Sequence, residues 1–252
     1  MSLYRLIKFE TKKLFKDRVA HTGAIVIILV GILYALSTYA ARPPGSYSGL
    51  NMILDTIYFQ GMGIFTIPLV TILITVYISS GEASTGTLKE LLTKPVKREN
   101  IMLSKFVAVF LYIAGITYGL LVISSLVGIR WGYPADFGIL ILKVIFIYLV
   151  YILGSMVLAA FTLMISALGT RPMLTTITAL GFHAVSIIFI VQPFELIRKY
   201  AFSQLVFDLA KLVMGQINNF RDIYQPVAII VIYILGFLLA ASFIWEKRDI
   251  TV

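Results

Sequence analysis

The sequence predicts an all-α, polytopic membrane protein that consists of one transmembrane domain over residues 1–252. Two observations predict this class. Of the 252 residues, 60% are hydrophobic and 13% are charged, whereas charged residues make up about a quarter of an average soluble domain. Six uncharged runs are each long enough for the roughly 20 residues that a transmembrane helix needs. We therefore expect the chain to cross a membrane several times.

The first predicted element is an amphipathic helix over residues 1–18. Apolar residues recur there at helical spacing, apart from Glu10, and six bases precede the first uncharged run: Arg5, Lys8, Lys12, Lys13, Lys16 and Arg18. This pattern is typical of a helix that lies on the inner leaflet of a membrane. A basic flank that only orients the first span is a compatible alternative. A secretory signal peptide fits poorly, because no small-residue cleavage site follows a short apolar core.

Six transmembrane helices are predicted from the uncharged runs. Their bounds are Val19 to Ala41, Thr56 to Gly81, Phe106 to Ile129, Val144 to Thr170, Pro172 to Phe194 and Ile223 to Trp245. Lys and Arg are concentrated before the first run and between the second and third runs, and such basic loops stay in the cytoplasm. Since an even number of spans returns the chain to its starting side, we expect both termini to be cytoplasmic.

Two of the connections have a distinctive composition. The fourth and fifth runs are separated only by Arg171, so Gly169-Thr170-Arg171-Pro172 is predicted to form a tight cytoplasmic turn. Residues 194–222 form the longest connection, and its apolar residues lie on one helical stripe: Ile197, Ala201, Leu205, Leu209 and Leu212. This stripe predicts an external helical segment that lies on the outer leaflet or dips into it.

A charged segment, residues 82–98, separates the second and third runs. In order, it holds the helix-capping residues Ser84, Thr85 and Thr87, the leucines Leu88, Leu91 and Leu92, and the helix-ending Pro95. The leucines fall at i, i+3 and i+4, which predicts a short helix with one apolar edge. Lys94 is pushed out of the α region by the proline that follows it. A helix this short is unstable in water by itself, so we expect it to pack on something else.

The order of residues in this segment resembles the cytoplasmic signature of type 2 ATP-binding-cassette (ABC) exporter permeases. The resemblance includes Lys105 in the following helix. In that family the segment is the coupling helix, which docks in a cleft of a separate ATPase subunit. The resemblance therefore implies that these residues contact the ATPase subunit: Glu82, Ser84, Thr85, Gly86, Thr87, Leu88, Lys89, Leu91, Leu92, Pro95 and Arg98. The alternative is an ordinary cytoplasmic turn between two spans.

The same resemblance implies the permease subunit of an ABC exporter in a prokaryotic inner or plasma membrane. Its partners would be two copies of an ABC ATP-binding subunit and a second permease subunit, as a homodimer. ATP and Mg would bind the ATPase rather than this chain, for which neither a cofactor nor an enzyme activity is expected. In agreement, the sequence contains no G-x-x-x-x-G-K-[ST] phosphate loop.

The composition also argues against a metal centre and against nucleic acid as a partner. The chain has no cysteine and two histidines, too few for a thiolate or histidine-based metal centre. Its net charge of +9 is explained by the cytoplasmic bias of Lys and Arg in membrane proteins, so nucleic acid is not an expected partner.

Some residues inside the runs are candidates for a special role. His183 could line a substrate path, although a neutral histidine bonded to a neighbouring helix is the more common situation. Gly115 and Gly119 form a G-x-x-x-G motif that permits close helix packing, either within the subunit or at a dimer interface. Three residues are expected to bend or loosen the second run: Gly61, Gly63 and Pro68.

Two further function classes stay open. One is an ATPase-independent secondary carrier, although such carriers usually place ionisable residues inside their spans. The other is a membrane assembly factor of the haem-export type, which would lack ATP-dependent flux. The direction of transport comes from the resemblance alone. An uncharged interior is compatible with lipids, apolar drugs or lipid-linked glycans as substrates, and a peptide could instead use the dimer interface.

Overall fold

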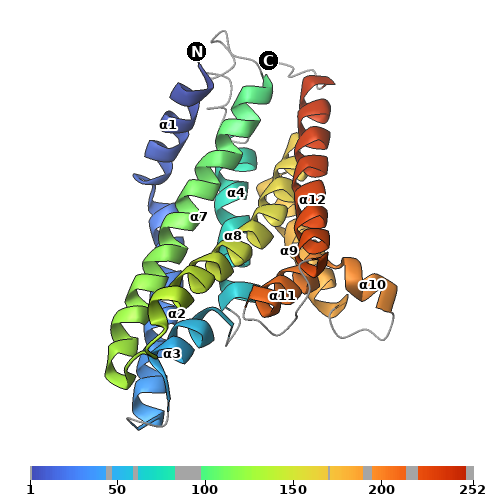
Figure 1. Ribbon diagram of the computed structural model, residues 1–252. Helices are drawn as coiled ribbons and strands as arrows, with labels where there is room; N and C mark the ends of the chain where they lie inside the picture. The colour runs from blue at the N-terminus through green and yellow to red at the C-terminus, as the bar shows by residue number, and fades with distance from the viewer. Residues whose placement is uncertain are drawn as a thin grey trace.

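The computed structural model describes residues 2–43, 47–58, 62–82, 98–169, 171–189, 195–213 and 221–247. Every regular element in these ranges is a helix (Figure 1), which confirms the all-α prediction. The α-helices are α1 (Leu3–Leu14), α2 (Arg18–Ala41), α3 (Gly49–Tyr58), α4 (Ile67–Val76), α7 (Arg98–Gly128), α8 (Phe137–Ala167), α9 (Pro172–Ile188), α10 (Glu195–Tyr200), α11 (Phe202–Val213) and α12 (Arg221–Lys247). Two π-helical turns flank α4: η2 (Met62–Thr66) and η3 (Tyr77–Gly81).

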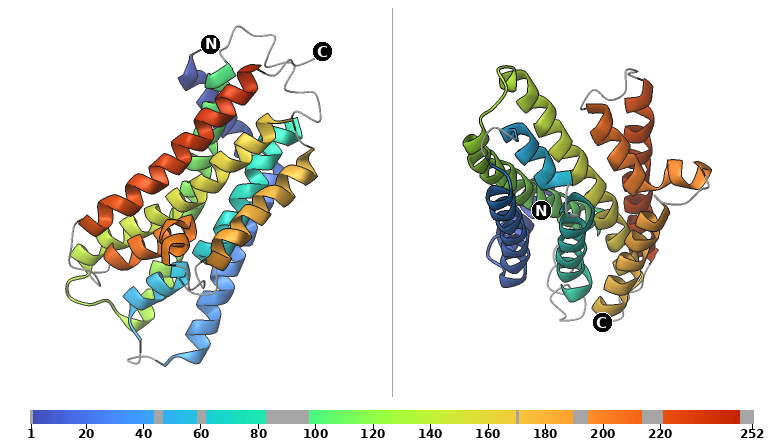
Figure 2. Two further views of the ribbon diagram at one scale, coloured as in Figure 1. Left: turned by 90° about the vertical axis from the view of Figure 1, so that its right-hand side faces the viewer. Right: turned by 90° about the horizontal axis from the view of Figure 1, so that it is seen from below.

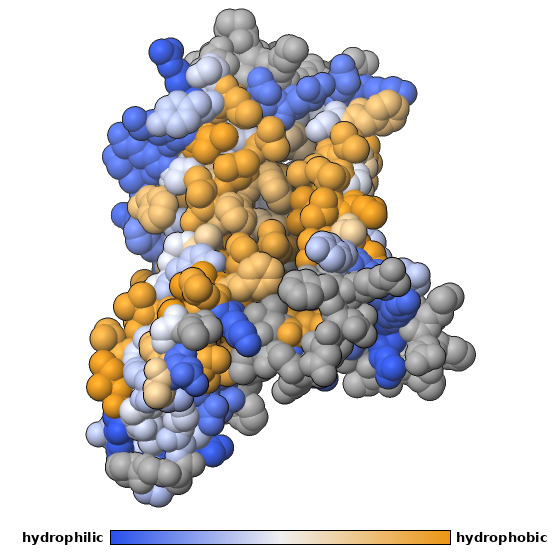
Figure 3. Space-filling model, in the orientation of Figure 1, coloured by the Kyte–Doolittle hydropathy of each residue, from blue (hydrophilic) through white to orange (hydrophobic). Residues whose placement is uncertain are grey.

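Among the described residues, five helical stretches are long and apolar enough to cross a membrane. They are Arg18–Ala41, Gly63–Gly81, Glu99–Trp131, Leu140–Ala167 and Tyr224–Lys247. Helix α9 corresponds to the fifth predicted run and has 17 residues, at the short end of the range for transmembrane helices. Figure 3 shows the hydrophobic side chains gathered in a band across the middle of one face. The polytopic class is confirmed, and the count of six spans stays a prediction.

Helix α8 forms the centre of the bundle. It packs against α4, α7, α11 and α12, and it crosses the middle of the molecule in the view from below (Figure 2). Its side chains Tyr148 and Tyr151 are completely buried. The hydroxyl of Tyr148 donates a hydrogen bond to the carbonyl of Ile53 in α3, at 3.1 Å. A polar atom this deep in an apolar core needs such a partner, since burying it unpaired is costly.

The second predicted run is not one uniform helix. Its first residues belong to α3, a separate short helix that the sequence analysis did not predict, and the described span begins at Gly63. Composition did not reveal α3 as a separate helix, because its last residues, Thr56 to Tyr58, are uncharged and therefore fell within the predicted run. Gly63 lies in η2, where a Cβ atom would overlap the ring of Tyr151. The structure thus places a π-helical turn where a loosened helix was expected; Gly61 lies outside the described residues.

The N-terminal helix and the predicted external segment both pack into the protein. In α1, Leu6, Glu10 and Leu14 are fully buried against α7. Within residues 194–222 the structure describes α10 and α11, and α11 packs on α8 and α12. Most of the predicted stripe on this segment is buried: Ala201, Leu205, Leu209 and Leu212. Both segments are helical where the structure describes them, and their apolar faces lie on neighbouring helices.

The predicted turn between the fourth and fifth runs is present. Gly169 has a φ of 76°, a conformation that glycine adopts without steric cost. Its N–H donates to the carbonyl of Ser166 at 2.9 Å, and α9 starts with Pro172. Thr170 lies outside the described residues.

The contact between α8 and α11 depends on a glycine. A Cβ atom at Gly154 would overlap a methyl group of Val206, so Gly154→Ala should destabilise the protein by about 1–3 kcal/mol through overpacking. Thermal unfolding of the purified protein measures this loss. Gly236→Ala in α12 is the matched control, because its new methyl group would meet no atom within 4 Å.

A double variant tests the assignment of this loss to the contact with Val206. Val206→Ala removes the overlapping methyl group, so Gly154→Ala should cost much less in that background than in the wild-type protein. An equal cost in both backgrounds, or no cost in either, would contradict the predicted close contact.

Candidate functional site

The site predicted from the sequence lies mostly outside the described residues. This applies to Ser84, Thr85, Gly86, Thr87, Leu88, Lys89, Leu91, Leu92 and Pro95. Glu82 is the last residue described before this gap, and Arg98 begins α7 after it; the side chain of Arg98 is also outside the description. The structure therefore shows the base of the segment, where the chain leaves the helical bundle and returns to it.

Four charged side chains meet at this base: Glu10, Lys13, Glu82 and Lys105, here called the basal charge cluster. The ammonium group of Lys105 donates hydrogen bonds to the carboxylate of Glu82 and, at 2.7 Å, to the carbonyl of Ile78. The same nitrogen lies 3.3 Å from Oε1 of Glu10. Lys13 donates to the other carboxylate oxygen of Glu82. Two acids and two bases thus form one connected network.

Three separate elements supply the cluster. Glu10 and Lys13 lie on α1, three residues apart, so they face the same side of the helix. Glu82 directly follows the π-helical turn η3, and Lys105 lies two turns into α7. Ile78, whose carbonyl accepts from Lys105, belongs to η3, and π-helical turns occur frequently at functional sites. The cluster therefore joins α1 to both stems of the charged segment.

Three members of the cluster are buried, which makes their pairing obligatory, and the fourth, Lys13, has a side chain that is 33% exposed. Glu10 is 0% exposed, Lys105 1% and Glu82 5%. Ions at such positions are tolerated only when they are paired and hydrogen-bonded. The carboxylate of Glu82 therefore faces its own chain, whereas the resemblance implied that it contacts the ATPase subunit. A contact between Glu82 and the ATPase subunit stays a prediction.

The acidity of Glu10 is shifted by its surroundings. Burial raises the pKa of its carboxyl group, and the nearby ammonium of Lys105 only partly opposes this effect. The sequence analysis noted Glu10 as an exception on an apolar helix face but gave it no role. An acid at that position, followed three residues later by a base, was the available signal.

Hydroxyl groups extend the connections of η3 to two more helices. Ser80 of η3 donates a hydrogen bond to Ser166 of α8 at 2.9 Å, and its oxygen lies 2.9 Å from the hydroxyl of Thr175 in α9. All three side chains are buried. The last turn of the second span is therefore bonded to α8 and α9 as well as to α1 and α7.

His183 bonds to the first π-helical turn. Its Nε2–H donates to the carbonyl of Ile64 in η2, at 2.7 Å, and the side chain is buried. The centroids of the Phe65 and Phe202 rings lie 6.4 and 6.0 Å from the centroid of the His183 ring. This is the bonded arrangement that the sequence analysis gave as the alternative to a substrate contact. A contact between His183 and substrate stays a prediction.

The G-x-x-x-G motif faces away from the rest of the described chain. A Cβ atom at Gly115 or Gly119 would meet no heavy atom within 4 Å. Exposed apolar residues continue the same face of α7: Leu111, Val122 and Leu126. Of the two interpretations given for the motif, close packing within the subunit therefore has no support at these positions.

Together, the fold and the basal charge cluster define a polytopic membrane protein whose second and third spans are bonded together at the base of a charged loop. A family model described as "ABC-2 family transporter protein" matches residues 6–191, a range that includes every residue of the cluster. The chain therefore belongs to the ABC-2 transporter family, as its sequence predicted. It is a permease subunit of an ABC transporter, and its family implies an ABC ATPase subunit as partner. No curated protein matches the chain.

The raised pKa of Glu10 predicts a pH-dependent stability. Between the ordinary value of 4.5 and the raised pKa, the folded protein holds more protons on Glu10 than the unfolded chain does. Stability contributed by this group therefore falls as the pH rises through that window. Glu10→Gln mimics the protonated form, so the unfolding temperature of the wild-type protein should drop relative to that of the variant as the pH rises from 4.5 through the raised pKa.

The Glu10→Gln variant retains the three other charged groups of the cluster, namely Lys13, Glu82 and Lys105. Glu99→Gln, at the exposed start of α7, serves as the control for the loss of one carboxylate outside the cluster. If the unfolding temperatures of the wild-type protein and Glu10→Gln differ by the same amount throughout this pH range, the pKa of Glu10 is not raised.

Proposed function

We propose that this chain, as a single permease domain over residues 1–252, couples ATP hydrolysis by a separate ATPase subunit to the export of a substrate. The coupling element is the segment of residues 82–98. ATP and Mg bind the ATPase, and this chain carries no cofactor of its own. Export as the direction follows from the resemblance of the segment to exporter permeases.

The observation that supports this proposal most is the basal charge cluster. A force applied to the segment reaches the membrane helices through its two stems, Glu82 and the start of α7. Because the cluster bonds these stems to each other and to α1, the three elements move together. Ser80 passes the same movement to α8 and α9. Separating any of these parts would expose an unpaired buried polar group, which is costly.

The segment itself supplies the contact with the ATPase. Leu88, Leu91 and Leu92 bury their apolar side chains in a cleft of the partner. The charged residues Lys89 and Arg98 orient the segment at the rim of this cleft, where ion pairs contribute specificity more than affinity.

We place both termini and the segment on the cytoplasmic side of a prokaryotic inner or plasma membrane. In Figure 1 the start of α1, the start of α7 and the end of α12 all lie at the same end of the bundle. The basic residues of α1 lie at this end, and basic loops are retained in the cytoplasm. The ATPase therefore meets the segment where ATP is available.

The working assembly is a homodimer of this chain with two ATPase subunits. The open face of α7 supports the homodimer, because Gly115 and Gly119 allow two helices to approach closely in a membrane. Leu111, Val122 and Leu126 flank the glycines on this face and are exposed in the single chain. An interface between two copies would cover them.

Leu91→Asp tests the proposed contact with the ATPase. A charge on the apolar edge of the segment would have to be buried in the partner's cleft, which costs several kcal/mol. The variant should therefore lose the ATPase during copurification while its amount in the membrane stays unchanged. Tyr4→Asp, which adds the same charge at an exposed position of α1, should retain the ATPase. Full complex formation and ATP-driven transport by Leu91→Asp would contradict the proposal.

Gly115→Leu tests the proposed dimer interface. The new side chain has free space in the single chain but would hold two α7 helices apart, so the variant should become monomeric without loss of thermal stability. Light scattering of the purified protein in nanodiscs measures the number of chains. Gly138→Leu in α8, where a Cβ also meets no atom within 4 Å, is the matched control. A Gly115→Leu variant that remains dimeric would exclude this face.

A further inference from the structure

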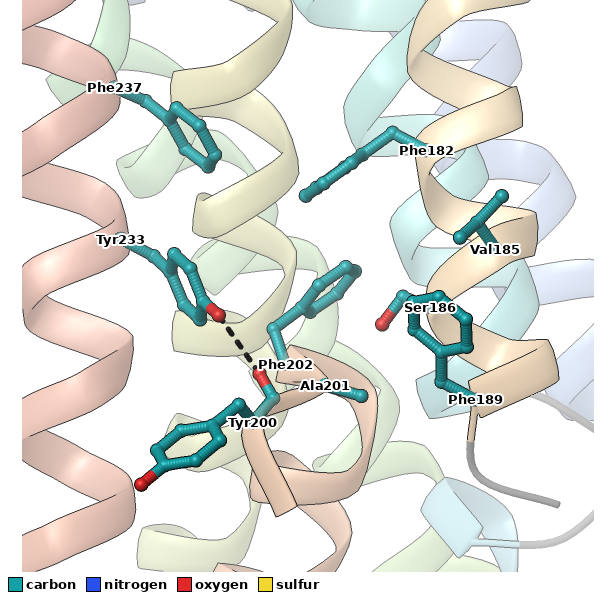
Figure 4. Close-up of a pocket in the computed structure, with 9 residues that line it drawn as sticks. All are labelled: Phe182, Val185, Ser186, Phe189, Tyr200, Ala201, Phe202, Tyr233 and Phe237. Atoms are coloured by element: carbon teal, nitrogen blue, oxygen red, sulfur yellow. Dashed lines mark hydrogen bonds between the residues drawn. The ribbon is translucent and has the colours of Figure 1, made fainter. Parts of the chain in front are cut away.

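A cavity of about 380 Å³ lies between α9, α11 and α12, next to the end of α10. Six aromatic side chains line it: Phe182, Phe189, Tyr200, Phe202, Tyr233 and Phe237. Figure 4 shows rings from α9, α11 and α12 turned toward one shared space. The volume falls in the range of sites that bind small molecules, roughly 300–1,000 Å³.

The inner part of the cavity offers few polar groups to a ligand. The hydroxyl of Ser186 donates to the hydroxyl of Ser203 at 2.9 Å. The hydroxyl of Tyr233 donates to the backbone carbonyl of Tyr200 at 2.9 Å, as the dashed line in Figure 4 shows. None of the described residues that line the cavity is charged. A polar group placed there would lose its hydration without gaining a partner, so the buried part of an occupant must be apolar.

The mouth of the cavity is different, because it is exposed and lies next to a cation. Val185 and Tyr200 line the cavity and are 45% and 43% exposed. The ammonium group of Lys199 lies 6.0 Å from the centroid of the Tyr200 ring. Arg198 is also exposed nearby, although it interacts electrostatically with Asp208. Among the described residues next to Tyr200, Lys199 is therefore a cation available to an anionic group at the mouth.

We propose that this cavity is a binding site for an anionic amphiphile, which is a molecule with an apolar tail and a negatively charged headgroup. The tail occupies the aromatic cavity, and the headgroup remains at the exposed mouth beside Lys199. Such a molecule can come from the membrane, as a bound lipid, or from the transported substrate. Binding itself does not rest on the proposed function; only the transported-substrate origin does.

Photo-crosslinking of the full-length protein in zwitterionic nanodiscs tests the site. The probe is a fatty acid with a diazirine at the end of its chain, and its neutral methyl ester is the control compound. Mass spectrometry should find the acid attached to residues that line the cavity, on α9, α11 or α12. Labelling spread over the exposed faces of α2 and α12 without a maximum at the cavity would overturn the proposal.

Two pairs of variants separate the tail site from the headgroup site. Val185→Trp fills the mouth and should lower the labelling about tenfold or more. Val231→Trp, at an equally exposed valine of α12 outside the cavity (43%), should not lower it. Lys199→Gln should reduce labelling by the acid about threefold, toward the level of the ester, whereas Lys143→Gln on α8 should change nothing. If Lys199→Gln leaves labelling by the acid unchanged, the anionic headgroup is excluded.

Two further measurements identify the source of the ligand. An anionic lipid that copurifies with the wild-type protein but not with Val185→Trp indicates a resident membrane lipid. A fatty acid that stimulates ATP hydrolysis by the complete complex, and does so less with Val185→Trp, indicates a transported substrate. If neither effect is found, labelling reflects binding at the added concentration only, and the proposal is overturned. A complex that lacks coupled ATPase activity altogether would contradict the proposed function but not the binding site.

Discussion

The buried ammonium group of Lys105 is the interaction on which the cytoplasmic end of this bundle depends. Transferring such an ion from water into a protein interior costs several kcal/mol, which is offset only when suitable partners surround it. Here the partners come from α1, η3 and the residue that follows η3. Losing one of them would leave a buried charge uncompensated, at a cost of about 3–5 kcal/mol. The network therefore fixes the relative positions of three elements that hydrophobic packing alone would allow to slide.

Helix α4 is held in the same manner at both of its ends. Each flanking π-helical turn has a carbonyl that accepts a hydrogen bond from a side chain of another helix. Ile78 in η3 accepts from Lys105 of α7, and Ile64 in η2 accepts from His183 of α9. A π-helical turn disturbs the regular bonding of the backbone, and these two side chains provide partners for it. The second span thus combines irregular helical geometry with fixed attachments, which suits an element that transmits movement.

Hydropathy predicted the fold well where one helix fills one apolar run. The run from Val19 to Ala41 corresponds closely to α2, because charged or turn residues mark both of its ends. It did not predict the separation of α3 from the second span, since no charged residue stands between them. The basal charge cluster could be predicted only in part. Lys105 and Glu82 belonged to the family resemblance, whereas the role of Glu10 depends on how α1 lies on α7, and that is a tertiary property.

The composition of the basal charge cluster has an electrical consequence. When all four side chains are ionised, two carboxylates and two ammonium groups cancel, so the cluster carries no net charge. Moving an elementary charge through a membrane potential costs about 2.3 kcal/mol per 100 mV, but a neutral group that moves as a unit avoids this cost. While all four groups stay ionised, a movement of the cluster as a unit would therefore perform almost no work against the transmembrane voltage, whereas a proton on Glu10, whose pKa is raised, would leave one net positive charge.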